Sequence, residues 1–276
     1  MKPNAMTLRE LLRDFASESL PPLPVAGVAC HSKQVRPGEV FVAVRGPFHD
    51  GHEFLDEAVR RGAAACVVER LPDKPLPCPA VVVPDATAAL AEIAARFYGR
   101  PVQRLRMIGI TGTCGKTTTA YLTRAILQAA GEPAGLLGTV AYEIGERHVP
   151  SANTTPGALT LQQLMAQMVE QGLRWCVMEV SSHALDQRRV EGLRFDAAVW
   201  TGLGSDHLDY HKTLEHYAHS KRKIFGYLRD GGRGVINFDD AYAQTLPETQ
   251  PGLPWVSFSL ERPATVHIRI LSSTWQ

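Results

Sequence analysis

The sequence predicts an α/β protein with a small mixed α/β N-terminal domain over residues 1–102 and a P-loop, mostly parallel-sheet central domain over residues 103–276. Three observations lead to this prediction. Beyond residue 105, apolar strand-like runs alternate with amphipathic helical runs, which is the pattern of a parallel sheet covered by helices. A Gly-Lys-Thr loop joins one of these strands to the helix after it. Between the two parts lies Gly99-Arg100-Pro101, where the proline cannot continue a helix.

The N-terminal domain is expected to contain three helices and three strands. Thr7 is a candidate N-cap with Glu10 completing a capping box, and Asp85 is a second candidate cap. Apolar periodicity predicts helices over residues 7–15, 52–61 and 85–98, and strands over residues 39–44, 63–69 and 80–83.

The central domain begins with a strand over residues 105–110 that leads into the Gly-Lys-Thr loop. Further strands are predicted over residues 134–140, 175–180, 195–201, 231–237, 255–258 and 266–270. Helices are predicted over residues 121–130, 159–171 and 214–228. No helix is expected after the last strand, so we expect this domain to be truncated.

Composition excludes several classes of protein. A net charge of +1 gives no electrostatic argument for nucleic acid or a membrane surface. No apolar run is long enough for a transmembrane helix, and the N-terminus lacks a signal-peptide core. The cysteines are odd in number and scattered, which favours reduced thiols in a cytoplasmic protein: Cys30, Cys66, Cys78, Cys114 and Cys176.

The stretch from Gly109 to Thr119 has the parts of a phosphate-binding loop in the required order. Glycines let backbone N–H groups approach phosphate oxygens, and the following helix points its positive end at the same anion. Lys116 would reach the terminal phosphates and the Thr117 hydroxyl would ligate Mg²⁺. The match to G-x-x-x-x-G-K-[ST] is imperfect, because Ile110 stands at the first glycine position. An ordinary glycine-rich turn is the alternative.

Glu179 ends a buried strand close to this loop. Ligands of open α/β sheets bind beyond the carboxyl ends of the strands, and an unpaired buried carboxylate is costly. A Mg²⁺ ligand therefore fits this position better than a core residue, with a salt-bridged structural acid as the alternative.

Three further segments carry residues suited to chemistry. Asp206 to His211 follows the strand over residues 195–201, where it would form a second metal site, a zinc site or a solvated loop. His216 and His219 lie one helical turn apart, which is compatible with zinc or with solvent. Lys221, Arg222 and Lys223 read on spacing alone as a solvated basic face. Asn153-Thr154-Thr155-Pro156 would otherwise be a simple helix cap.

In this order the motifs resemble those of the Mur ligase family: Thr-Gly-Thr-x-Gly-Lys-Thr-Thr, Asn-Thr-Thr-Pro, Met-Glu-Val-Ser-Ser-His, Asp-His-Leu-Asp-Tyr-His and Glu-His-Tyr-x-x-x-Lys. The front domain agrees through His31-Ser32-Lys33, residues 37–43 and Asp50-Gly51-His52, which are similar to a uridine-nucleotide-binding domain. The resemblance covers roughly residues 28–240 and is strongest to the branch that adds the third residue of the peptide.

The resemblance implies an ATP-dependent, amide-forming ligase of peptidoglycan synthesis, and through it a part in cell shape and cell division. ATP would phosphorylate the D-glutamate carboxylate of UDP-N-acetylmuramoyl-L-alanyl-D-glutamate, and the amine of a free amino acid would attack the acyl phosphate. The implied cofactors are ATP and Mg²⁺, and the enzyme would be a cytoplasmic monomer without nucleic-acid or membrane partners.

The resemblance also implies roles for particular residues. Lys116, Glu179, His207 and Lys221 would be catalytic. ATP would be held by Gly112, Thr113, Cys114, Gly115, Lys116, Thr117 and Thr118. The metal ligands would be Thr117, Glu179, His207 and Lys221, the last as a carbamylated lysine. This role reverses the interpretation of Lys221 as part of a solvated basic face. The substrate would contact Ser32, Thr154, Thr155, Ser181, Gln187 and Arg189.

Some positions depart from the family pattern. Cys114 replaces an Asn, Gly202 and Gly204 replace Asn and Ser, Ser205 replaces an Arg, and His31 and Lys33 replace Asp and Arg. The family's third domain is not recognised, so we expect weak nucleotide binding and no amide synthesis by this chain alone. The competing hypothesis is a noncatalytic nucleotide-binding relative. A third possibility, a ligase of folylpolyglutamate or cyanophycin synthesis, agrees poorly with the front domain that carries Ser32.

Overall fold

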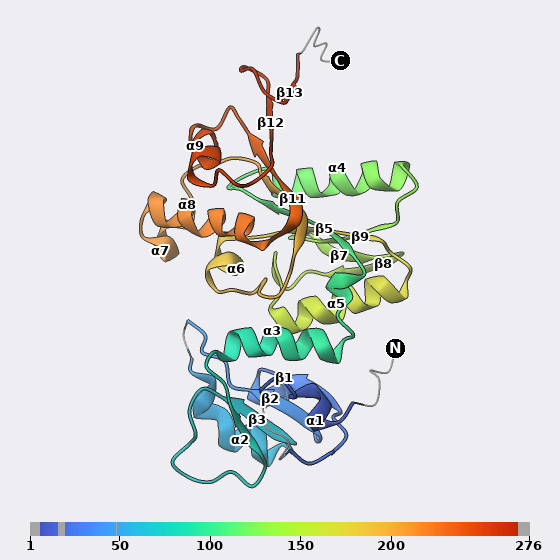
Figure 1. Cartoon of the computed structure of the whole chain (residues 1–276), viewed down its shortest axis with the longest axis vertical. Helices are drawn as coiled ribbons and strands as arrows, with labels where there is room; N and C mark the ends of the chain where they lie inside the picture. Colours follow the sequence, from blue (N-terminus) through green and yellow to red (C-terminus); the bar gives the residue numbers. More distant parts are fainter. Residues whose placement is uncertain (1–5, 16–19, 48, 270–276) are drawn as a thin grey trace. The chain divides into compact units, whose positions relative to one another are not determined.

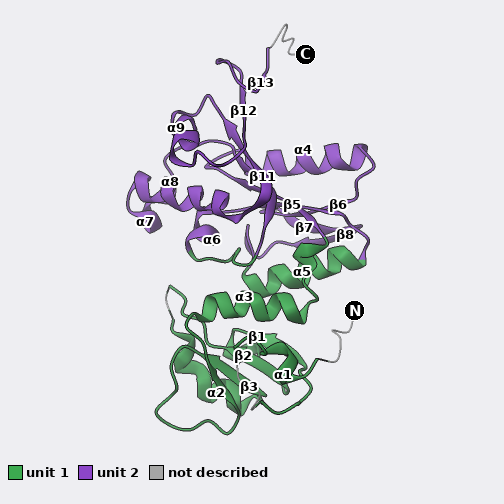
Figure 2. Ribbon diagram, in the orientation of Figure 1, with its two compact units in different colours: residues 1–104, 157–170, 187–192 green, residues 105–156, 171–186, 193–276 purple. Residues whose placement is uncertain are grey.

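The computed structural model describes residues 6–15, 20–47 and 49–269. The chain divides into two compact units (Figures 1 and 2). Unit 1 holds residues 1–104, 157–170 and 187–192, and unit 2 holds the rest. The two segments of unit 1 that follow residue 104 could not be foreseen from a single cut near residue 102. The assignment of one domain to uridine binding and the other to ATP remains a prediction.

Unit 1 is built on a parallel sheet in the order β1-β2-β3-β4. Its strands are β1 (Gly27–Ala29), β2 (Glu39–Val42), β3 (Ala65–Val68) and β4 (Ala80–Val82). Its α-helices are α1 (Leu8–Leu11), α2 (Leu55–Arg60), α3 (Ala86–Phe97) and α5 (Ala158–Glu170). The described residues of unit 1 also form 3-10 turns over Ser32–Gln34 and Gly51–Phe54, and a further one over Pro101–Gln103 follows α3.

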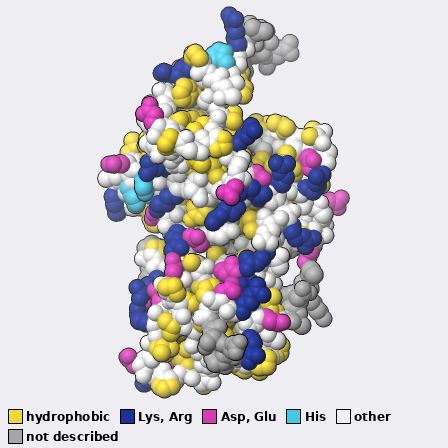
Figure 3. Space-filling view, viewed as in Figure 1, with side chains coloured by type: hydrophobic (Ala, Val, Ile, Leu, Met, Phe, Trp, Pro, Cys, Tyr) yellow, Lys and Arg dark blue, Asp and Glu magenta, His cyan; other side chains and the backbone are white. Residues whose placement is uncertain are grey.

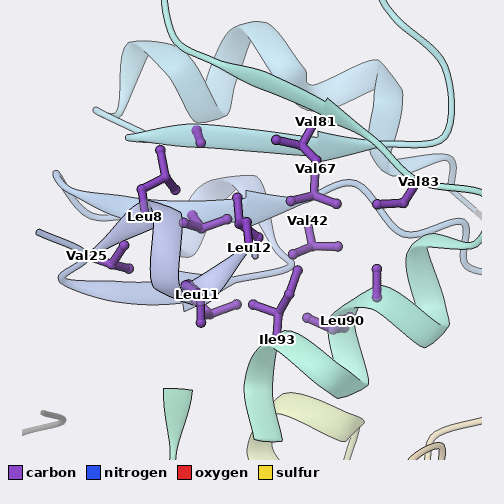
Figure 4. Packing of buried hydrophobic residues seen from close by; sticks show 14 of the residues in the cluster. Leu8, Leu11, Leu12, Val25, Val42, Val67, Val81, Val83, Leu90 and Ile93 are labelled. Atoms are coloured by element: carbon purple, nitrogen blue, oxygen red, sulfur yellow. The ribbon is translucent and has the colours of Figure 1, made fainter. Parts of the chain in front are cut away.

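Alternation along β2 sends side chains to two separate cores. Val40 and Val42 join the cluster of Leu8, Leu11, Val67 and Ile93 seen in Figure 4. Phe41 joins the opposite cluster with Leu55 and Cys66. Leu159 of α5 packs against the first cluster, which explains why a segment so late in the sequence belongs to unit 1.

The predicted helix caps of unit 1 are confirmed. Thr7 accepts a hydrogen bond from the Glu10 N–H while the Glu10 carboxylate accepts from the Thr7 N–H, which is the expected capping box. The Asp85 carboxylate accepts from the Ala88 N–H at 2.9 Å and caps α3. The helix that Thr7 starts is nevertheless shorter than predicted and ends at Leu11.

Unit 2 is built on a nine-stranded sheet in the order β13-β12-β11-β10-β5-β9-β6-β7-β8. All pairs are parallel except β6–β7 and β7–β8. The strands are β5 (Arg106–Thr111), β6 (Ala134–Leu137), β7 (Ala141–Ile144), β8 (Arg147–Pro150), β9 (Trp175–Glu179), β10 (Phe195–Trp200), β11 (Leu228–Asn237), β12 (Trp255–Ser259) and β13 (Val266–His267).

The helices of unit 2 are α4 (Lys116–Ala129), α6 (Ser182–Asp186), α7 (Leu208–His211), α8 (Leu214–Arg222) and α9 (Ala241–Thr249). A 3-10 turn over Lys223–Tyr227 follows α8. The α4 helix packs through Ala120 on the sheet face that carries Ile110, Leu136 and Val177.

Several element predictions for unit 2 need correction. The strand over residues 134–140 ends at Leu137, and the antiparallel β7–β8 hairpin follows it, turning at Gly145 with φ +61°. The helix over residues 214–228 ends at Arg222. The α9 helix was not predicted and carries Pro247 in its interior. The predicted strand over residues 266–270 ends at His267, and residue 270 lies outside the described residues.

Basic and acidic side chains are interspersed over the face shown in Figure 3, as the near-zero net charge leads one to expect. Within the described ranges, no helix has both the length and the apolar character needed to cross a bilayer.

Candidate active site

The phosphate loop joins the carboxyl end of β5 to the first residue of α4, as predicted. Gly112 has φ +151°, and a Cβ there would lie 1.9 Å from Thr201 Oγ1, so only glycine fits. Gly115 precedes the helix with φ +84°. The α4 helix is 14 residues long and directs its free N–H groups and positive dipole end toward the loop.

Two lysines converge on one carbonyl of this loop. Lys116 Nζ donates to Gly112 O at 2.8 Å and to Thr113 O at 3.0 Å. Lys221 Nζ, from the end of α8, donates to the same Gly112 O at 2.8 Å. The prediction from spacing that Lys221 lies on a solvated face is wrong, because only 1% of this residue is exposed.

The surroundings of Lys221 disfavour its charged form. Burial and then the nearby charge of Lys116 lower the pKa of Lys221 to about 7. Its Nζ lies 4.3 Å from the centre of the Tyr217 ring. Burial also lowers the pKa of Lys116, against the opposing charge of Glu179. Lys223, by contrast, forms an ion pair with Asp186 at 2.8 Å.

Glu179 is fully buried at the end of β9, next to the end of β5. Its Oε2 accepts hydrogen bonds from Thr117 Oγ1 at 2.9 Å and Thr139 Oγ1 at 3.1 Å, and its Oε1 accepts from the Thr139 N–H at 2.9 Å. A Cβ at Gly138 would lie 2.3 Å from Glu179 Oε1, so this glycine makes room for the carboxylate. These partners are hydroxyls and an amide, which does not match the salt-bridged alternative.

A cavity of about 430 Å³ in unit 2 gathers most of the predicted site. Its lining includes Thr113, Cys114, Gly115, Lys116, Thr117, Thr118, Thr154, Glu179, Ser181, His207 and Lys221. Two lining residues were not predicted, namely Thr139 and Ser182. Thr139 lies between Glu179 and Thr154, with its Oγ1 3.0 Å from Thr154 Oγ1, and its place in the turn after β6 gave no motif signal.

Thr155 is buried behind the residues that line this cavity and is not one of them. Its Oγ1 donates to Glu179 O at 2.9 Å and accepts from the Ser181 N–H at 3.0 Å, so it ties the end of β9 to the Asn153–Pro156 segment. His207 has a left-handed backbone with φ +52° and lies with its Nε2 3.5 Å from Asp206 Oδ2.

The oxygen atoms at Thr117 and Glu179 suit Mg²⁺, which prefers hard oxygen ligands in proteins. Within residues 6–15, 20–47 and 49–269 there is no group of three or more His, Cys, Asp or Glu side chains placed to hold a metal. The zinc interpretations of His216 and His219 and of the Asp206–His211 segment therefore gain no support. His216 Nδ1 instead lies 2.9 Å from His211 O, and His219 Nδ1 lies 3.2 Å from an Arg222 nitrogen.

The remaining predicted substrate residues lie in unit 1. Ser32, Gln187 and Arg189 line a cavity of about 770 Å³ that has apolar walls from Phe41, Val44 and Leu90. Ser32 Oγ donates to Glu57 Oε2 at 2.5 Å, and Gln187 Oε1 accepts from Arg189 at 2.7 Å. The two departing positions His31 and Lys33 line the same cavity.

The departures near the phosphate loop have clear structural consequences. Gly202 O accepts from the Thr113 N–H at 2.9 Å, and the Gly204 N–H donates to Thr113 Oγ1 at 2.8 Å. Backbone groups at these glycines therefore hold the loop, where side chains were expected. Cys114 is exposed at the cavity.

Two family models match the chain. The Mur ligase middle domain matches residues 110–276, and a second model, Mur ligase family, catalytic domain, matches residues 24–98. The chain belongs to the Mur ligase family.

Curated relatives include the UDP-N-acetylmuramoyl-L-alanyl-D-glutamate--2,6-diaminopimelate ligases of Geobacter sulfurreducens and Chlorobaculum tepidum. The first is 45% identical over 248 residues, 88% of this chain and 48% of the relative. The second is 48% identical over 223 residues, 80% of this chain and 44% of the relative. The chain therefore spans about half the length of the curated relatives it matches.

Solved structures give the same result. A structure of UDP-N-acetylmuramoyl-L-alanyl-D-glutamate--2,6-diaminopimelate ligase matches with a TM-score of 0.77 and 27% identity, over 94% of this chain and 53% of that one. The MurF ligase from Thermotoga maritima in complex with ADP matches with a TM-score of 0.56 and 26% identity, over 85% of this chain and 50% of that one.

Proposed function

We propose that this chain carries the nucleotide-binding and UDP-substrate-binding parts of an ATP-dependent ligase. The enzyme adds the third amino acid to UDP-N-acetylmuramoyl-L-alanyl-D-glutamate in peptidoglycan precursor synthesis. The observation that carries the proposal is the single cavity in which the phosphate loop, two lysines and the Thr117–Glu179 pair meet. The reaction named for the relatives and the ADP complex of a structural neighbour support it.

Within that cavity the nucleotide phosphates would lie against the loop amides and Lys116. The Lys116 amine already lies on the loop through Gly112 O and Thr113 O, and it would turn from these carbonyls to phosphate oxygens. Thr117, Glu179 and His207 would hold Mg²⁺. When bound, Mg²⁺ neutralises charge on the phosphates and so stabilises the transferring group.

Lys221 is proposed to become a carbamate. With a pKa near 7, a large fraction of its amine is uncharged at neutral pH and is nucleophilic. The amine nitrogen bonds to the carbon of CO₂, one C–O π pair moves to oxygen, and the amine loses a proton to water. The product is an anion beside Lys116, where a second cation was costly, and it would supply oxygen ligands to the metal.

The UDP-linked dipeptide is proposed to use two groups of residues. Ser32, Gln187 and Arg189 of unit 1 would contact it, and so would Thr154 and Ser181 of unit 2. Thr155 was predicted to contact it as well, but this residue is buried behind the cavity lining and would instead hold Ser181 in place. We propose that residues 1–102, which hold Ser32, bind the uridine nucleotide and that residues 103–276, which hold the phosphate loop, bind ATP, with Gln187 and Arg189, which belong to the same unit as Ser32, added to the first group. We propose that the protein is a monomer and that it is cytoplasmic; its free cysteines support the second part.

The alternative function is a noncatalytic nucleotide-binding member of the family. The thiol of Cys114 favours it, because sulfur donates hydrogen bonds poorly where the family has an amide. Both functions require nucleotide binding, so only turnover separates them.

Three measurements test the proposed function. Calorimetry with the ATP analogue AMPPCP should give one site per chain, with affinity that rises when Mg²⁺ is present and does not rise in Glu179→Gln. Glu132→Gln, a change on the loop before β6, is the matched control.

In a thermal-shift assay, the UDP-linked muramoyl dipeptide should raise the Tm of the wild type and raise that of Arg189→Ala by less. Release of ADP that depends on both dipeptide and amino acid would exclude the noncatalytic alternative, whereas no effect of either ligand would contradict both functions.

A further inference from the structure

The wall of the nucleotide cavity at Ser182 rests on a buried histidine, His211, which the sequence placed only in a segment suited to a metal site or a solvated loop. Ser182 begins α6 and His211 ends α7, and only 1% of each residue is exposed. His211 Nε2 lies 3.0 Å from Ser182 Oγ. A buried hydroxyl without a partner is costly, so this contact helps to fix where α6 begins.

The other ring nitrogen continues the contact away from the cavity. His211 Nδ1 lies 3.5 Å from Ser220 Oγ, and Ser220 Oγ donates to Asp186 Oδ1 at 3.3 Å. Asp186 also accepts from Lys223 Nζ at 2.8 Å and from Tyr210 OH at 3.1 Å. Burial opposes the charge of Asp186, but the hydrogen bonds from Lys223 and Tyr210 outweigh it and lower the pKa of Asp186.

The Asp186 carboxylate sets the donor and acceptor roles in this series of hydrogen bonds. An ionised Asp186 can only accept hydrogen bonds, so the Ser220 hydroxyl donates its hydrogen bond to Asp186. The Ser220 oxygen then accepts a hydrogen bond from His211 Nδ1–H. A neutral imidazole has one N–H, so Nε2 is left as an acceptor, and Ser182 donates to it. Burial, with the nearby His183 and His216, lowers the pKa of His211 to about 4, in agreement with a neutral ring.

We infer that His211 is a positioning residue for the nucleotide cavity, whose neutral imidazole accepts a hydrogen bond from the Ser182 hydroxyl and holds the Ser181–Ser182 wall in place. This inference rests on the proposed function, since the wall matters only if a nucleotide binds there. His211 itself does not line the cavity. Its effect passes through Ser182 and its neighbour Ser181, which line the cavity.

Calorimetry with Mg²⁺ and AMPPCP tests the inference on the whole chain. Ser182→Ala and His211→Ala should each weaken binding about tenfold, because each removes the same buried hydrogen bond and disturbs the wall. The double variant should bind no more weakly than the weaker single variant. His211→Gln, whose amide oxygen can accept from Ser182, should stay within about threefold of the wild type. His219→Ala, at an exposed position on α8, is the control.

An NMR measurement supplies a readout that a merely structural role would not move. In a chain labelled with ¹⁵N-histidine, His211 should show the Nδ1–H tautomer, and Ser182→Ala should shift its Nε2 resonance while His219→Ala should not. If His211→Ala does not fold, Ser182→Ala and His211→Gln decide the question.

The inference is overturned if folded Ser182→Ala and His211→Ala bind like His219→Ala, if the losses multiply in the double variant, or if His211 is the Nε2–H tautomer. Absence of binding by the wild type is a different result and would contradict the proposed function.

Discussion

Lys116 and Lys221 place their side-chain nitrogens on the same backbone oxygen, that of Gly112, each at 2.8 Å. One lysine comes from the start of α4 and the other from the end of α8. Two cations this close repel each other in a buried setting, which is a state suited to an anionic ligand or to loss of one charge.

The first prediction concerns stability and pH. The folded pKa of Lys221, about 7, lies below its ordinary value of 10.5. The unfolded chain therefore binds more protons between these values, and stability rises with pH across them. The free energy of unfolding should increase by about 2 kcal/mol from pH 7 to pH 9 from this group alone. Urea titrations in CO₂-free buffer should show the rise in wild type and a flatter profile in Lys221→Met.

The second prediction concerns modification of Lys221. In ¹³C-bicarbonate, one carbamate carbon signal per chain is expected for the wild type, because a pKa of about 7 leaves a substantial fraction of the amine uncharged at neutral pH. The signal should vanish in Lys221→Gln and persist in Lys74→Gln, which changes an exposed lysine. A signal that survives in Lys221→Gln would place the carbamate elsewhere.

The third prediction concerns the loop glycine. Gly112→Ala forces a methyl group to within 1.9 Å of Thr201 Oγ1 at φ +151°. We expect a loss of about 1–3 kcal/mol of stability and of most AMPPCP binding. Gly131→Ala, at φ +75° with nothing within 4 Å of the new methyl group, is the control and should leave binding unchanged. Equal binding by both variants would argue against the loop as the phosphate site.

The fourth prediction uses the departing Cys114. This thiol is exposed at the cavity, whereas Cys66 and Cys176 are buried. Alkylation followed by peptide mass spectrometry should show Cys114 labelled at least about tenfold more slowly when Mg²⁺ and AMPPCP are saturating. Cys78 in unit 1 is the internal control. Its Sγ lies 3.9 Å from Cys66 Sγ, and its labelling should not depend on nucleotide. Unchanged labelling of Cys114 would count against nucleotide in this cavity.

Local chemistry predicted part of this molecule well. The caps at Thr7 and Asp85 and the loop between β5 and α4 are set by neighbours in sequence, so they could be foreseen. Order along the chain also placed Glu179 at a strand end beside that loop, since parallel strands end at one edge of the sheet.

Other features depend on contacts distant in sequence. Spacing put Lys221 on a solvated face, but packing of α8 buries it against Gly112, 109 residues away. The β7–β8 hairpin has strands of only four residues, too short for a clear alternation signal. The positioning role proposed for His211 depends on its 3.0 Å contact with Ser182, which no local pattern in the sequence indicates. The α9 helix was not predicted, and it holds Pro247 in its interior, a residue that normally disfavours a helix.

The central claim is that this cavity binds the phosphates of ATP, and calorimetry with Mg²⁺ and AMPPCP on wild type and Lys116→Met tests it most directly. The wild type should bind one nucleotide per chain, and Lys116→Met should bind at least about 100-fold more weakly, because the lysine reaches the terminal phosphates. Absence of binding by the folded wild type, or equal affinity in the variant, would contradict the claim.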